Sequence, residues 1–131
     1  MNFEFISEQH AFRDSVRGFA EKHLRAGALA RAHDPAHPWD VSRLMARQGL
    51  MGITMPEEDG GQGGTLMDAI LAIEAVAESC PKSADVVQAG NFGPVRVLAE
   101  YGNRDQKDRY LRGMIDGSRT TYFCPSGSGS L

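Results

Sequence analysis

The sequence of 131 residues lacks the features of several specialised protein classes. It has only two cysteines, Cys80 and Cys124, which stand far apart without CxxC spacing. This usage predicts buried thiols in a reducing compartment and no disulfide framework. Basic residues are not in excess either, because 14 lysines and arginines stand against 17 aspartates and glutamates, a formal net charge of −3. This balance argues against a nucleic-acid partner.

Long apolar runs are also missing. No stretch reaches the ~18 uninterrupted apolar residues that a membrane span needs, since even residues 69–77 are interrupted by Glu74. The first residues, MNFEFISEQ, have neither a basic start nor an apolar core of signal-peptide length. We therefore expect no membrane span, no secretion signal and a cytoplasmic protein.

The sequence does contain helical periodicity, in five segments. Their approximate bounds are residues 7–30, 39–48, 65–80, 83–101 and 103–117. Ser7 is expected to cap the first helix, and the pairs Thr65 with Asp68 and Asn103 with Gln106 have the spacing of capping boxes. The fourth segment contains Gly90, Gly93 and Pro94 and is predicted to kink or break there.

Turn residues separate these segments. Gly49 is placed to end the second helix in a left-handed conformation, and the following stretch, LMGITMPEEDGGQGG, predicts an irregular loop that starts facing inward. In the third segment, apolar residues such as Leu66, Ile70 and Leu71 cover most of the circumference. That pattern is typical of a central, buried helix.

Residues 119–124, RTTYFC, are β-branched and aromatic and predict a strand without a partner in this chain. The predicted fold is therefore all-α, a five-helix, up-down, orthogonal bundle-like domain with a C-terminal orphan β-strand. We expect residues 1–118 to form the helical domain and residues 119–131 to be the start of a missing β-domain followed by a flexible tail.

Isolated chemical motifs do not define a reaction. His33 and His37 have the spacing of helical metal ligands, but prolines interrupt the helix and no third ligand is apparent. Glu74 and Glu78 share a helix face and are read as a solvated stripe rather than an acid and base pair. Cys80 is read as a buried helix-end thiol rather than a nucleophile. The GGQGG cluster lacks the lysine of a phosphate loop.

The order of the segments resembles the N-terminal helical domain of the acyl-CoA dehydrogenase family. The resemblance covers nearly the whole chain and rests on five pieces in order. They are residues 7–20 (SEQHAFRDSVRGFA), residues 49–63 (GLMGITMPEEDGGQG), Ile73-Glu74 followed by Ala77, residues 101–103 (YGN), and residues 106–111 (QKDRYL) with Gly117.

The resemblance implies an oxidoreductase that removes an α-proton and a β-hydride from an acyl-CoA thioester and passes the hydride to FAD. It implies a homo-oligomer or a partner subunit, with the flavin held where further domains meet this one. The family's glutamate base usually lies on a later helical bundle. We therefore expect no catalytic residue and no metal ligand in this chain, and no dehydrogenase activity from it alone.

The same resemblance assigns cofactor contacts at the C-terminal end. In the family, the first β-strand runs into a Thr-Glu-Pro-x-x-Gly-Ser-Asp turn that contacts flavin and substrate. Here Pro125 keeps the proline, Phe123 and Cys124 replace threonine and glutamate, and Gly129-Ser130 match Gly-Ser after a one-residue insertion. Phe123, Gly129 and Ser130 are the cofactor-binding residues that the resemblance implies.

Two other functions remain open from the sequence. The chain is alternatively a non-catalytic binding or scaffold module that docks on a full-length relative, because an orphan strand and an uncovered apolar face suit such a role. It is also compatible with the same domain of a flavin monooxygenase or an acyl-CoA oxidase, which resemble dehydrogenases in this region.

Overall fold

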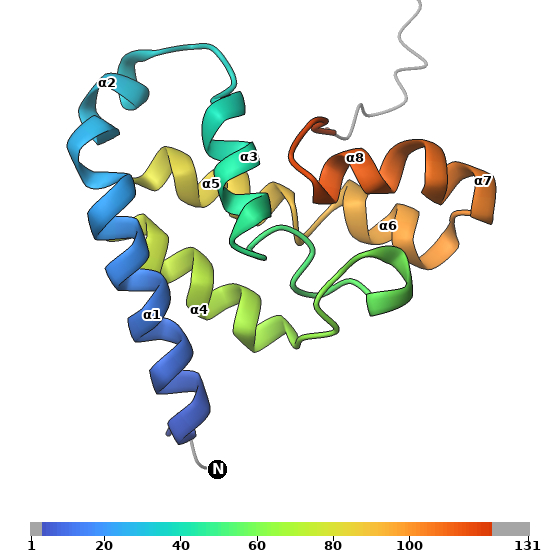
Figure 1. The fold of residues 1–131 in the computed structure, drawn as a ribbon, viewed down its shortest axis with the longest axis horizontal. Coiled ribbons are helices and arrows are strands. Elements are labelled where there is room, and N and C mark those ends of the chain that lie inside the picture. Colours follow the sequence, from blue (N-terminus) through green and yellow to red (C-terminus); the bar gives the residue numbers. More distant parts are fainter. Residues whose placement is uncertain (1–3, 122–131) are drawn as a thin grey trace, which may run out of the picture.

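The computed structural model describes residues 4–121, and all regular structure among them is helical (Figure 1). The predicted all-α class is therefore confirmed for this part of the chain. The elements are α1 (Ser7–His23), η1 (Arg25–Gly27), α2 (Ala28–His33), α3 (Trp39–Arg47), η2 (Glu57–Asp59), α4 (Leu66–Ala77), α5 (Pro81–Ala89), α6 (Pro94–Tyr101), α7 (Arg104–Gln106), η3 (Lys107–Leu111) and α8 (Arg112–Ile115).

The helices form two groups around two apolar clusters. In the first, α1 lies along α4, and α5 packs against α2, α3 and α4 around residues such as Leu24, Met45 and Val76. In the second, α6, η3 and α8 enclose a smaller cluster that contains Val95 and Leu111. α5 thus ends where the two groups meet.

Two of the three predicted helix caps are confirmed. The Asp68 amide donates to Thr65 Oγ1 at 3.2 Å while the Thr65 amide donates to the Asp68 carboxylate at 2.8 Å. Asn103 and Gln106 form the same reciprocal pair at 2.9 and 3.0 Å. The prediction for Ser7 was wrong, because the N-cap is Ile6, whose amide donates to Gln9 Oε1.

The predicted break in the fourth segment is confirmed. α5 ends at Ala89, and α6 starts at Pro94 after Gly93, which has a φ of 69°. α5 begins earlier than predicted, at Pro81, since proline suits a first helical position that needs no amide donor. The first segment is also divided, because a short 3-10 turn separates α1 from α2.

The third segment departs from the expectation of a helix buried on most sides. Ala69, Leu71 and Val76 are buried, and small alanines allow α1 to approach closely. Leu66 and Ile70, however, are each 49% exposed. Periodicity identified the apolar positions but not how many neighbours would cover them.

Asn91 fixes the predicted inward-facing start of the 50–64 loop to the end of α5. Its fully buried Nδ2 donates to the carbonyls of Leu50 and Val87, both at 2.8 Å, and its Oδ1 accepts from the Thr54 amide at 3.3 Å. The left-handed Gly49, with a φ of 72°, precedes this loop as predicted.

Asp59 fixes the far side of the same loop to the C-terminal helices. Its carboxylate is fully buried and accepts from Arg104 at 3.0 Å and from Lys107 at 2.9 Å. These two clamps, at Asn91 and Asp59, hold the irregular loop between the two groups of helices.

The predicted C-terminal strand falls largely outside the described residues. Residues 119–121 have no regular structure, and residues 122–124 are not among those described. Within residues 4–121, no helix has both the length and the apolarity to cross a membrane.

Candidate functional site

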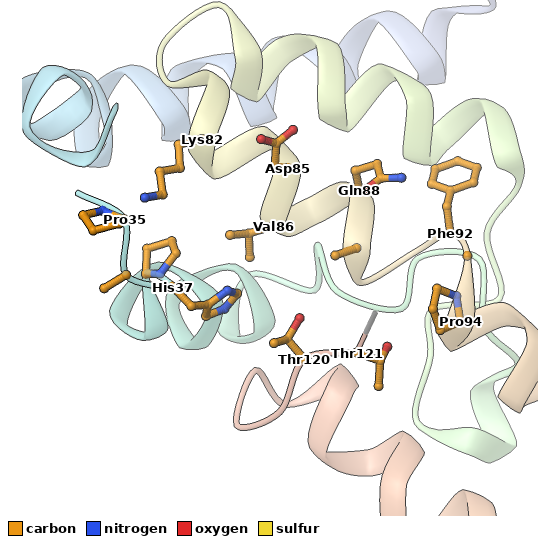
Figure 2. A pocket seen from close by; sticks show the side chains of 14 residues that line it. Pro35, His37, Lys82, Asp85, Val86, Gln88, Phe92, Pro94, Thr120 and Thr121 are labelled. Atoms are coloured by element: carbon orange, nitrogen blue, oxygen red, sulfur yellow. The ribbon is translucent and has the colours of Figure 1, made fainter. Parts of the chain in front are cut away.

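A groove with a volume of about 460 Å³ lies beside α5 (Figure 2). One wall is α5 with the start of α6, a second is the segment of residues 35–38, and the third is formed by Thr120 and Thr121. These segments are far apart in the sequence. The break between α5 and α6 brings Phe92 and Pro94 to one end of the groove.

The floor of the groove is apolar. Val86 and Ala89 are three residues apart on α5 and therefore share a helix face, and Val86 is buried. Below them lies a further cavity of about 10 Å³, bordered by Met51 and Met114, which has room for about one water molecule. The floor therefore suits a short apolar group rather than a charged one.

The end of the groove near residues 34–38 is polar. His37 Nε2 lies 2.8 Å from Ser42 Oγ, and the centroids of the His37 and Trp39 rings are 4.3 Å apart, with the ring planes tilted by 57°. Burial, together with the charge of nearby Lys82, lowers the pKa of His37, so the imidazole is neutral at pH 7. The Lys82 ammonium donates to the carbonyl of Asp34.

The outer edge of the groove carries other polar groups. Asp85 and Gln88 are exposed on α5. Thr120 and Thr121 form the opposite edge, where the Thr121 hydroxyl donates to Met114 Sδ at 3.8 Å. This contact ties the last described residues to α8 beside the groove.

The cofactor-binding residues that the resemblance implies, Phe123, Gly129 and Ser130, lie outside the described residues. They follow Thr121 in the sequence, and Thr121 lines the groove. Sequence reasoning missed the groove itself, because Lys82, Val86 and Ala89 belong to no motif. The one signal of the groove in the sequence was Lys82, a charged residue four positions before the apolar Val86 and therefore on the same helix face.

The other candidate groups are engaged elsewhere. Glu78 accepts two hydrogen bonds from Arg17, at 2.7 and 2.8 Å, and this ion pair links α1 to α4. Cys80 is buried; burial would raise the pKa of its thiol, but hydrogen bonds from Ser83 and Arg31 outweigh that effect and lower it. Within residues 4–121, no group of three or more histidine, cysteine, aspartate or glutamate side chains is placed to hold a metal ion.

Comparison with known proteins identifies the family. The model of the acyl-CoA dehydrogenase N-terminal domain matches residues 7–118, and the chain belongs to this family. It is 32% identical over 123 residues to the probable acyl-CoA dehydrogenase YngJ of Bacillus subtilis, covering 94% of this chain and 32% of that protein. It is 28% identical over 117 residues to the 3-sulfinopropanoyl-CoA desulfinase of Paraburkholderia xenovorans, covering 89% of this chain and 30% of that protein.

Solved structures agree on the fold. The butyryl-CoA dehydrogenase of Megasphaera elsdenii matches with a TM-score of 0.76 at 24% identity, covering 92% of this chain and 32% of that one. The chain thus spans about a third of the length of the relatives that it matches. The resemblance of the helical pattern to this family is confirmed.

Proposed function

We propose that the chain is the N-terminal helical domain of a flavin-dependent acyl-CoA dehydrogenase-like oxidoreductase that acts on CH–CH bonds of acyl thioesters. Residues 1–118 form the domain, and residues 119–131 begin a β-domain. The groove beside α5 is one wall of the cavity for the acyl group and the flavin. The observation that carries this proposal is the apolar floor of the groove, formed by Val86 and Ala89. Thr121 lines the same groove and directly precedes, in the sequence, the residues that resemble the flavin-contacting turn.

The chain's own contribution is to bind and shield the acyl group. Each CH₂ removed from water contributes roughly 0.8 kcal/mol when fully buried, so a single wall that covers one side supplies about half of that. FAD would accept the hydride when bound. Phe123, Gly129 and Ser130 are proposed to contact it, and the base that takes the α-proton is proposed to lie outside this chain.

The apolar side chains at the start of α4 bear on the assembly. Leu66, Met67 and Ile70 are each 41–49% exposed. Neighbouring apolar side chains that are exposed in this way are typical of a surface that contacts another protein or domain. They support a further domain, a partner subunit or a second copy that covers this face. The alternative of a non-catalytic docking module rests on the same face, and a cytoplasmic location remains part of the proposal.

An NMR titration of the 131-residue chain tests the proposal. We expect millimolar butyryl-CoA to shift the backbone amides of residues 85–90 and of Thr120 and Thr121. Free CoA, which lacks the acyl group, should shift them much less. Shifts confined to other parts of the chain, or none with butyryl-CoA, would mean that the groove is not an acyl-binding wall and would favour the docking module.

A further inference from the structure

The polar end of the groove carries a cation without a counter-charge. Within residues 4–121, no carboxylate oxygen lies within 4.0 Å of the Lys82 ammonium, whose hydrogen bond goes to the neutral carbonyl of Asp34. An ammonium group has three donors, so this contact leaves two of them for a ligand. The Lys82 charge acts on a group that lines the groove, because it contributes to the lowered pKa of His37.

The other charged group of the groove faces a different way. Asp85 is exposed one turn further along α5. In Figure 2 its carboxylate is turned away from the end marked by Pro35 and His37, toward which the Lys82 side chain extends. His37 is neutral at pH 7 because burial and Lys82 lower its pKa. Of the charged side chains that line the groove, Lys82 is therefore the one that extends toward residues 35–38. The Asp34 carboxylate, which is outside the lining, accepts from the Ala36 amide at 2.9 Å.

The spacing along α5 sets the length of a ligand that reaches this charge. Lys82 and Val86 are one helical turn apart, about 6 Å along the axis. An acyl chain that lies on the floor formed by Val86 and Ala89 needs only a few carbons to bring its far end to the Lys82 ammonium. A methyl group there would leave the ammonium unpaired, whereas a carboxylate or a similar anion would form a charge-assisted hydrogen bond with it.

We propose that the groove is selective for short acyl thioesters whose far end is anionic, and that Lys82 is the residue that determines this specificity. The inference rests on the proposed function, because it assumes that the acyl group lies in the groove. His37 closes the same end as a neutral hydrogen-bonding group held by Ser42.

The test compares two thioesters of equal acyl length that differ only at the far end, glutaryl-CoA and pentanoyl-CoA. Their affinities for the 131-residue chain are measured at pH 7.5 by NMR titration. We expect glutaryl-CoA to bind about tenfold more tightly, and Lys82→Met to remove this preference. Lys82→Arg should retain most of it, because the cation remains. Lys22→Met, which removes an exposed lysine of α1, is the matched control and should leave the tenfold ratio intact.

The outcomes separate the two claims. If both thioesters shift the groove amides with equal affinity, or if Lys82→Met keeps the tenfold ratio, the specificity inference is wrong and the proposed function stands. If neither thioester shifts the groove amides, the proposed function itself fails. A rise in ionic strength should weaken the preference for glutaryl-CoA, since a half-exposed ion pair is screened by salt.

Discussion

Replacing Asn91 with leucine is expected to destabilise the folded chain by about 3–5 kcal/mol, although the two side chains are similar in size. The substitution leaves the carbonyls of Leu50 and Val87 and the amide of Thr54 without the partners that Asn91 provides. Each unpaired buried polar group costs about 1–3 kcal/mol. The Val87 carbonyl has no helical substitute, because the Asn91 amide donates to Gln88 instead.

Urea denaturation measures this effect as a change in the free energy of unfolding at constant m-value. Gln88→Leu is the matched control, since Gln88 is exposed on the same helix, and it should cost less than about 0.5 kcal/mol. A loss below about 1 kcal/mol for Asn91→Leu would show that the loop does not depend on this side chain.

Lys107→Met is expected to have the second largest effect, about 2–3 kcal/mol. It leaves the fully buried Asp59 carboxylate with Arg104 alone, whose side chain is 54% exposed. Removing one partner of a buried ion pair costs about 3–5 kcal/mol when the other charge is left uncompensated, and the remaining arginine reduces that cost. Arg112→Met removes an exposed pair with Asp108 and should cost less than about 1 kcal/mol.

The same clamp predicts a dependence of stability on pH. The hydrogen bonds from Lys107, and then from Arg104, hold the pKa of Asp59 below its ordinary value despite burial. Because the folded pKa is lower than the unfolded value of about 3.9, the stabilisation is fully present above pH 4. It is lost as the pH falls through the folded pKa. Between pH 4 and pH 2, the wild type should lose stability more steeply than Asp59→Asn; parallel curves would contradict this assignment.

Local signals were predictable from the sequence. The capping pairs at Thr65 and Asn103 act over three residues, so their spacing alone defines them. The break at Gly93 and Pro94 was predictable for the same reason. The start of α1 was not, because Ser7 lies inside the helix and the N-cap position falls on Ile6, whose amide donates to the Gln9 side chain.

The candidate site could not be predicted in the same way. It joins residues 35–38, α5 and Thr120–Thr121, and only the packing of α5 against its neighbours brings these segments together. His37 was noted for its distance in sequence from His33, but its structural partner is Ser42. Similarly, the periodicity of α4 marked Leu66 as apolar without showing that it remains exposed.

The most direct test of the central claim is the affinity of butyryl-CoA for a variant whose groove is filled. Ala89→Phe places a ring over the floor beside Val86, and we expect it to weaken butyryl-CoA binding at least fivefold and to abolish the amide shifts at Thr120 and Thr121. Ala32→Phe, at an exposed position of α2 outside the groove lining, should bind as the wild type does. Unchanged affinity in Ala89→Phe would contradict the assignment of this groove as the acyl-binding wall.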